Sequence, residues 1–267
     1  MAGISHNDCH LSLQLGNGRL SVALQDRLNF HHRKVDLDLS AQSTEELNQQ
    51  LHTIREWGSA YSVSCSITEP GNTLVPEAIY HEENLAHYHH FHLDAPRNAN
   101  IASDKLIMLP AYNVYALPDG CELVTRVFPT CHILHESTVE LELALRLARQ
   151  ANQNGAWLFF GNGFFRLILI QDGQLQLANT FRFASEMDVA YYVLYVFDQM
   201  HIDPKQFRTF ATGNIDPAGA ILTLLREYIG AVSLLSNSTL ADTTWKGKNE
   251  QQALSGFTLL HQVLCAS

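Results

Sequence analysis

The sequence lacks the features that mark several large classes of protein. Its 17 lysines and arginines stand against 27 aspartates and glutamates, form no extended basic cluster, and leave a formal net charge of -10. Because binding to nucleic acid or to an anionic membrane needs concentrated positive charge, we expect neither partner. No apolar run reaches the roughly 18 residues of a membrane span, and residues 1–10 lack the pattern of a signal peptide. We therefore expect no membrane insertion and a cytoplasmic location.

Paired cysteines and common catalytic motifs are also missing. The five cysteines are scattered and form no Cys-x-x-Cys pair, which favours free thiols in a reducing compartment. No Gly-x-Ser-x-Gly, His-Glu-x-x-His or phosphate-binding Walker pattern occurs, so common hydrolase classes are disfavoured. Cys131 and His132, with His135 nearby, could form a metal site or a Cys-His nucleophile. A structural role is favoured, because no residue that would orient them can be named.

What the sequence does contain is an internal repeat. With 46% hydrophobic and 16% charged residues it has the composition of a folded globular chain. The tripeptide Gly16-Asn17-Gly18 recurs as Gly161-Asn162-Gly163, which lies 145 residues later (161 minus 16). Apolar residues alternate with others before and after the first copy, and both copies are flanked by apolar runs. Each copy therefore predicts a hairpin of two strands joined by a tight glycine turn.

The segments after the two hairpins also correspond. Each half continues with a third strand (30–39 and 175–183), a helix that begins near Ser43 or Ser185, and a further strand (61–67 and 207–212). The second helix is apolar nearly all round, so we expect it to be deeply buried. Five further helices are predicted: near 76–91, near 119–127, one capped by Ser137, one that begins at Asp216-Pro217, and one over about 250–264. Short strands are predicted near 114–117 and near 133.

The duplication predicts an α/β protein of two subdomains, each with a mixed sheet and packed helices. The polar break at residues 152–155 suggests the boundary, so the expected subdomains are residues 8–152 and 153–267.

Two tandem copies of a three-strand meander, a crossover helix and a further strand resemble a known duplicated fold. It is the ribonuclease H-like fold shared by actin, the heat-shock chaperone ATPases and sugar kinases. The sequences of residues 157–173, 179–181, 190–197 and 212–215, with 74–76 and 113–115, are similar to an uncharacterised bacterial family known for an actin-like ATPase fold of unknown function. The chain more distantly resembles actin-like scaffold proteins of type IV pilus and type II secretion machines.

The resemblance implies a nucleotide site in an interdomain cleft, with ATP and magnesium as ligands. The phosphate-binding turns would be Gly16, Asn17 and Gly18 together with Gly161, Asn162 and Gly163, because glycine lets backbone N–H groups approach an anion. The adenosine-binding turn would be Thr212, Gly213 and Asn214. The family pattern places an aspartate before each glycine turn, where this chain has Gln14 and Phe159, and two adjacent glycines in the adenosine turn, where it has one.

These departures favour a non-catalytic protein. Neither glutamine nor phenylalanine can hold a magnesium ion as a carboxylate does. The expected function is therefore association with a partner protein or with further copies of the chain, while weak nucleotide binding stays open. The alternative is an active ATPase whose carboxylate comes from Asp8, Asp172 or Asp216.

Two further clusters carry a functional and a structural interpretation. His81, Glu82, Glu83, His87, His89, His90, His92 and Asp94 could bind a divalent metal ion, or could form a solvated helix edge, which is the commoner case. Tyr191, Tyr192, Tyr195 and Phe197 could line a ligand pocket, although their helical spacing among valines and leucines favours plain core.

Overall fold

The computed structural model describes residues 9–16, 18–26, 31–39, 43–57, 62–92, 99–118, 120–235, 254 and 256–265. The chain forms two compact units, one of residues 1–139 with 259–267 and one of residues 140–258. This division falls between residues 139 and 140, whereas the sequence suggests a boundary at 152–155. Residues 259–267 belong to the first unit. The subdomain ranges 8–152 and 153–267 stay a prediction.

The first unit contains a five-stranded sheet, called the first sheet, with the strand order β3-β2-β1-β4-β8. The strands β1 to β3 form an antiparallel meander, and β4 and β8 continue the sheet parallel to β1. Its elements are β1 (Cys9–Gly16), β2 (Arg19–Asp26), β3 (His31–Asp38), α1 (Thr44–Arg55), β4 (Ser62–Ile67), α3 (Cys121–Val127) and β8 (His132–His135). Ser43 caps α1 through a reciprocal capping box with Glu46, as its sequence predicts.

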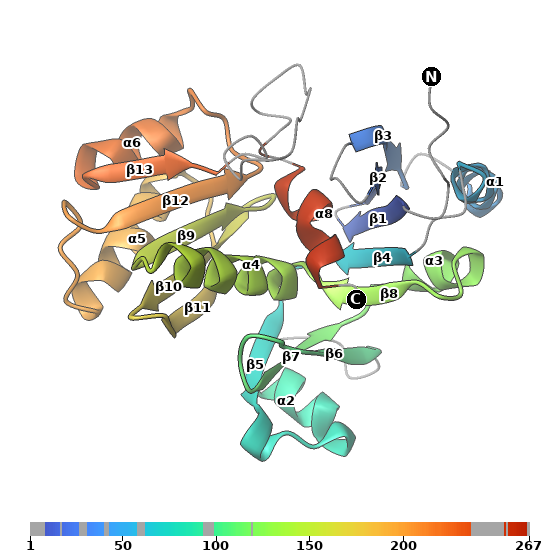
Figure 1. The fold of residues 1–267 in the computed structure, drawn as a ribbon, viewed down its shortest axis with the longest axis horizontal. Coiled ribbons are helices and arrows are strands. Elements are labelled where there is room, and N and C mark those ends of the chain that lie inside the picture. Colours follow the sequence, from blue (N-terminus) through green and yellow to red (C-terminus); the bar gives the residue numbers. More distant parts are fainter. Residues whose placement is uncertain are drawn as a thin grey trace. The chain divides into compact units, whose positions relative to one another are not determined.

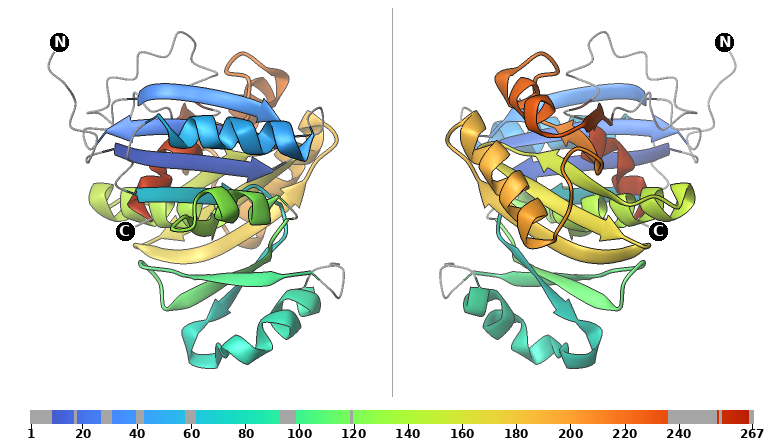
Figure 2. Two further views of the ribbon diagram at one scale, coloured as in Figure 1. Left: turned by 90° about the vertical axis from the view of Figure 1, so that its right-hand side faces the viewer. Right: turned by 90° about the vertical axis from the view of Figure 1, so that its left-hand side faces the viewer.

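The two faces of the first sheet differ in chemistry. One face is apolar and packs beneath α1 and α3, which lie in front of the strands in the left view of Figure 2. On the other face, buried side chains include His10, Ser12, Ser64 and Gln25. The C-terminal segment, α8 (Phe257–His261) followed by a 3-10 turn (Gln262–Leu264), bonds to the strands of this polar face. The Gln25 amide donates to the Leu260 carbonyl at 3.0 Å, and the Gln262 amide donates to the Leu13 carbonyl at 2.9 Å.

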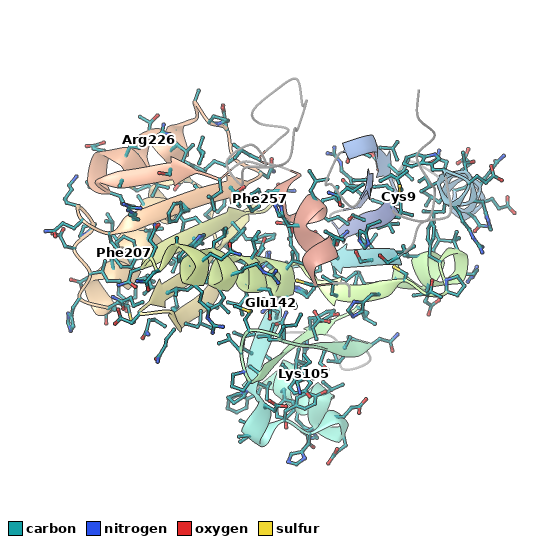
Figure 3. All side chains as sticks on the ribbon, viewed as in Figure 1. Cys9, Lys105, Glu142, Phe207, Arg226 and Phe257 are labelled. Atoms are coloured by element: carbon teal, nitrogen blue, oxygen red, sulfur yellow. The ribbon has the colours of Figure 1, made fainter. Side chains whose placement is uncertain are left out.

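A small three-stranded sheet with the order β5-β7-β6 completes the first unit. Its elements are β5 (Asn72–Pro76), 3-10 turns at Glu77–Ile79 and Glu82–Asn84, α2 (Leu85–His92), β6 (Ile101–Lys105) and β7 (Ala111–Ala116). Lys105 of this sheet, labelled in Figure 3, forms an ion pair with Glu77 at 2.7 Å. The continuous helix expected over 76–91 is wrong, because residues 76–84 form a strand end and two short turns before α2 begins.

The second unit repeats the topology of the first sheet in a second sheet, with the order β11-β10-β9-β12-β13. Its elements are α4 (Glu136–Ala151), β9 (Gly155–Phe160), β10 (Phe164–Gln171), β11 (Gln174–Arg182), α5 (Glu186–Gln199), β12 (Arg208–Gly213), α6 (Ala220–Tyr228) and β13 (Ala231–Leu234). Figure 1 shows α4 on one face of this sheet and α5 on the other. Within the described part of the chain, the duplicated strand-strand-strand-helix-strand order is confirmed.

The core of the second unit lies between the second sheet and the helices α5 and α6. Buried side chains from β9 and β10 meet those of α5 and α6 in one cluster. The expectation that α5 is deeply buried is wrong: Val193 and Phe197 are buried, but Met187, Tyr191 and Tyr195 are exposed. The helix is therefore amphipathic in its burial, with one buried and one exposed face, although its composition is apolar nearly all round.

Two other elements begin elsewhere than their sequence patterns predict. Ser137 does not cap α4, since its hydroxyl contacts the ring of His135 and the helix begins at Glu136. The helix expected from Asp216-Pro217 begins at Ala220, because Asp216 forms a turn that precedes it. The strands β5, β6 and β13 have no counterpart among the expected elements.

The C-terminal helix expected over about 250–264 is described only in part, at residue 254 and residues 256–265. Among the helices of the described residues, none has the length and apolar character needed to cross a membrane.

Candidate functional site

The two glycine turns occupy equivalent places in their units. In the first unit, the Thr68 N–H after β4 donates to the Leu15 carbonyl of β1 at 2.8 Å. In the second, the Asn214 N–H after β12 donates to the Phe160 carbonyl of β9 at 2.7 Å. The carbonyls of Gly18 and Gly163 likewise accept bonds from the chain that follows β3 and β11. The repeat is therefore preserved down to individual backbone hydrogen bonds.

The second unit brings together two of the three expected nucleotide-binding segments. The turn at Gly161, Asn162 and Gly163 follows β9, and Thr212, Gly213 and Asn214 lie at the end of the adjacent parallel strand β12. Gly213 has a φ of +93°, and a Cβ there would lie 2.4 Å from the Phe160 carbonyl oxygen, so only glycine fits. The carboxyl ends of parallel strands are where ligands bind in open α/β sheets, so this edge is the candidate site.

The glycine turn of this edge is packed rather than open. The Gly161 N–H donates to the Phe164 carbonyl at 2.9 Å, which leaves it unavailable to an anion. A Cβ on Gly161 would lie 2.2 Å from the Phe164 ring, so the ring fills the space that the missing side chain leaves. Only Asn162 and Gly163 form an exposed tip, where Gly163 has a φ of +74°.

Behind the Phe164 ring lies a buried ion pair. The Arg166 guanidinium lies 4.9 Å from the centre of that ring and bonds the Glu140 carboxylate of α4 at 3.0 Å. Both charged side chains are only 4% exposed. The two charges pair with each other, and the positive charge of Arg166 is directed to a carboxylate of the protein rather than to a bound phosphate.

The described alternatives to the missing aspartate of the second glycine turn are Asp172 and Asp216. Phe159, at the position of the aspartate, is buried. Asp172 lies in the turn at the far end of β10, about 24 Å along the strand from Phe164 at the usual rise per residue. Asp216 follows β12 at the candidate edge, and its carboxylate accepts the Ala218 N–H at 3.0 Å. Asp8, the third alternative source, lies outside the described residues.

The adenosine-turn residues are partly committed to the fold. The Thr212 hydroxyl donates to the Leu235 carbonyl at 2.6 Å, whereas the Asn214 side chain is exposed. Asn214 is therefore the residue of this turn whose side chain is available to a ligand.

In the first unit the glycine turn lies between β1 and β2, and Asn17 is outside the described residues. A Cβ on Gly16 would lie 2.5 Å from the Thr68 carbonyl oxygen, so this glycine allows close approach of the neighbouring chain. Gln14, at the aspartate position, donates its amide to the Glu136 carboxylate at 2.5 Å. The Gln14 side chain is thus engaged by a carboxylate of the chain itself.

A buried polar network near the start of α4 was not predicted by the sequence. Asp104 of β6 accepts bonds from the Tyr115 hydroxyl at 2.8 Å, the Thr138 hydroxyl at 2.6 Å and the His135 N–H at 2.7 Å. Burial raises the pKa of the Asp104 carboxyl, and these three donors oppose the shift. The network ties the small sheet to β8 and α4. Because β6 itself has no clear sequence signal, the network could not have been found from the pattern.

The histidine of that network is held by serine and asparagine. The Ser137 N–H donates to His135 Nδ1 at 3.1 Å, so Nδ1 acts as an acceptor and the Ser137 hydroxyl, 2.6 Å from it, can donate as well. The Asn113 amide donates to Ser137 Oγ at 2.9 Å.

Burial raises the pKa of Cys131 to about 12, so its thiol stays protonated near neutral pH. The Cys-His nucleophile interpretation is therefore disfavoured.

The histidine-rich segment does not assemble a metal site among the described residues, where no group of three or more histidine, cysteine, aspartate or glutamate side chains converges. His81 and Glu83 approach only to 4.0 Å on the surface, and His89 is buried. Asp94 lies outside the described residues.

Comparisons with known proteins identify the fold. The model of a family described as "Protein of unknown function (DUF3822)" matches residues 3–232. A solved protein of Bacteroides thetaiotaomicron, described as having an actin-like ATPase fold and unknown function, is 18% identical, with a TM-score of 0.75 over 95% of this chain and 99% of its own. The PilM-PilN type IV pilus biogenesis complex contains a chain 10% identical, with a TM-score of 0.65 over 96% of this chain and 98% of its own. No curated protein matches the sequence. At these identities the solved structures establish an actin-like ATPase fold, and the resemblance seen in the sequence is confirmed.

Proposed function

The chain belongs to the DUF3822 family of proteins of unknown function and has an actin-like ATPase fold, and from this premise we propose that it is a non-catalytic member of that fold which acts by binding another protein. The observation that carries the proposal is the packing at Gly161. Its N–H is bonded within the hairpin, and the Phe164 ring fills the space beside it. A phosphate group that occupied the space beside Gly161 would have to displace the buried Phe164 ring.

The missing carboxylates support the same proposal. Hydrolysis of ATP needs a positioned magnesium ion and a positioned water molecule, and both depend on fixed negative charge near the phosphates. Gln14 is neutral and bonded to Glu136, and Phe159 is apolar and buried. A protein that retains the fold without aspartates at these two positions would keep its framework and surfaces rather than the chemistry.

A second candidate function, nucleotide binding without hydrolysis, is favoured by one feature. Asn162, Gly163 and Asn214 are exposed at the same edge of the second sheet, where backbone N–H groups and two amides could contact a phosphate or a sugar. Such binding would be weak, because Phe159 supplies no carboxylate to hold magnesium, although the exposed Arg182 of β11 pairs with Phe164 beside this tip.

Calorimetric titration of ATP, ADP and GTP with magnesium into metal-free protein tests these proposals, alongside thermal unfolding, since a ligand bound to the folded state raises its stability. We expect either no binding or dissociation constants above about 100 µM, corresponding to binding free energies weaker than about -5.5 kcal/mol. Asn214→Ala is the matched variant, since it removes an exposed amide without disturbing the core. A submicromolar constant for any of the three nucleotides would contradict the proposal.

A further inference from the structure

Helix α5 carries an exposed stripe of large side chains. Met187, Tyr191 and Tyr195 are 60%, 60% and 50% exposed, and their spacing of four residues places them in one row along the helix. In the right view of Figure 2, α5 lies on the face of the second sheet that is turned toward the viewer. We call these three residues the α5 stripe. Large exposed apolar side chains that gather in one place mark interaction surfaces more often than single ones do.

The rings of the stripe are supported from the core. Tyr191 stacks on Tyr195 with ring centres 6.0 Å apart and meets Tyr192 edge-on at 5.5 Å. Tyr192 stacks on Phe181 at 4.9 Å, and Phe181 stacks on the fully buried Phe165 at 5.4 Å. A continuous row of rings therefore links the hairpin core to the surface. Side chains held in this way lose little conformational freedom when a partner binds, which is typical of residues that dominate interface energy.

The charged residues of α5 have one sign. Asp188 and Asp198 lie on the exposed face of α5 with the tyrosines, Glu186 begins the helix, and the helix contains no lysine or arginine. The Asp188 carboxylate accepts the N–H groups of Ala184 and Ser185, which lower the pKa of Asp188 and keep it ionised. Within the described part of the chain, neither Glu186 nor Asp198 forms an ion pair, and the Asp198 carboxylate accepts only a bond of 3.3 Å from the Gln199 amide.

We propose that the α5 stripe docks an arginine-bearing amphipathic helix of a partner protein. This inference rests on the proposed function and specifies its surface. A guanidinium group stacks on the face of a tyrosine and bonds a carboxylate through its edge, so tyrosines bordered by aspartates suit arginine better than lysine. Leucine side chains on the same helix would cover Met187 and the tyrosine rings.

The same charges argue against two other occupants. A second copy of this chain brings a net charge of -10 and the same acidic border, so it would meet like charge. An anionic membrane would be repelled for the same reason. The stripe offers on the order of a few hundred Å², the scale of a transient interface formed by one helix rather than of a permanent dimer.

The test uses the full-length protein and a fluorescein-labelled helical peptide of about 20 residues, built from leucine and arginine in an amphipathic pattern. A second peptide carries glutamate in place of arginine. Binding is followed by anisotropy at about 0.15 M salt, where screening reduces non-specific attraction. We expect Tyr191→Ala/Tyr195→Ala to weaken binding of the arginine peptide by about tenfold or more, and Asp198→Asn by about threefold.

The matched control is Tyr228→Ala, which removes a similarly exposed tyrosine from α6 of the same unit and is expected to change the affinity less than about twofold. Tyr191→Lys is a second disruptive variant, for use if the double alanine variant folds poorly. Its positive charge would repel the arginines of the peptide. Unchanged binding to the stripe variants, or equal binding of the glutamate peptide, would overturn the inference. So would no binding of the arginine peptide to the unaltered protein.

Two parallel measurements detect the other occupants. Sedimentation that shows a dimer lost in Tyr191→Ala/Tyr195→Ala would assign the stripe to self-association instead. Co-sedimentation with phosphatidylserine vesicles that the same variant abolishes would assign it to a membrane. Either result overturns the arginine-helix inference. Neither result tests the proposal of a non-catalytic protein, which is tested separately by the nucleotide titration and does not involve α5.

Discussion

The two five-stranded sheets share one topology but differ on one of their faces. One face of each sheet packs against the helix that follows its third strand, α1 in the first unit and α5 in the second. On this face the central strands are apolar: Leu11 and Leu13 in β1 match Ala156 and Leu158 in β9. On the opposite face, Ser12 and Ser64 of the first sheet stand where the second has Trp157 and Phe210, whose rings stack with centres 5.3 Å apart. The repeated topology thus requires only one apolar face, and the other face has diverged in chemistry.

The polar face of the first sheet is held by hydrogen bonds instead of rings. His10 contacts Ser62 Oγ at 2.7 Å through Nδ1 and Ser64 Oγ at 2.9 Å through Nε2. The C-terminal segment bonds to the same region through glutamine amides. The stability that this face contributes should therefore depend on the protonation of His10 and on individual hydrogen bonds. On the corresponding face of the second sheet it should depend on the volume of the packed side chains.

The largest contrast is expected from removing the buried indole. Trp157→Ala should reduce the free energy of unfolding by about 3–5 kcal/mol, because it leaves a cavity against Phe210. The equivalent Ser12→Ala should cost only about 1 kcal/mol, since it removes one hydrogen bond of 3.3 Å to Gln25. Urea unfolding of both variants measures the difference. Equal losses would show that the two faces contribute alike.

The buried ion pair should give the next largest effect. Arg166→Met leaves the Glu140 carboxylate buried without its cation and should destabilise the protein by about 3 kcal/mol. Arg166→Met/Glu140→Leu should recover most of that loss, because the double variant removes both buried charges. Thermal unfolding of the three proteins forms the cycle, and a double variant no more stable than the single one would contradict this account.

Gly161 should be more sensitive than the other glycine of its turn. Gly161→Ala forces a Cβ against the Phe164 ring and should cost about 2 kcal/mol. Gly163→Ala has free space around its Cβ and should cost about 1 kcal/mol, the strain of its positive φ. The order of the two unfolding midpoints is the readout. If Gly163→Ala proves the worse, the turn is not held by the Phe164 ring.

The last contrast is a pH dependence in the first unit. Burial lowers the pKa of His10 from 6.5 to about 4, so the folded state favours the neutral ring. The resulting stability is fully present above pH 6.5 and is lost as the pH falls through 4, by about 3 kcal/mol in all. His10→Gln should flatten the curve of unfolding free energy against pH. A slope identical to that of the unaltered protein would exclude His10 as its source.

The sequence predicted the parts of the fold that depend on local pattern. Both hairpins, the Ser43 cap, the helix start near Ser185 and the third strands follow from alternation, glycine turns and a capping box, and all are confirmed. The failures depend on tertiary contacts. Ser137 bonds the ring of His135 rather than capping α4, and the strand order of the small sheet has no local signal.

The candidate site shows the same limit. The sequence could identify the glycine turns and the missing aspartates, because both are matters of residue type. It could not reveal that the Phe164 ring packs on Gly161 or that Glu136 accepts the Gln14 amide, since these partners are known only once the chain is folded. Exposure of Tyr191 and Tyr195 was hidden by their valine and leucine neighbours in the same way.

The central claim is that the glycine turns are structural and do not support ATP hydrolysis. The most direct measurement is phosphate release from ATP and magnesium under single-turnover conditions, with protein in excess of nucleotide. The account predicts release no faster than in the protein-free control. Faster release that Asp216→Asn abolishes would contradict it, because Asp216 is the described carboxylate that follows β12 at the candidate edge.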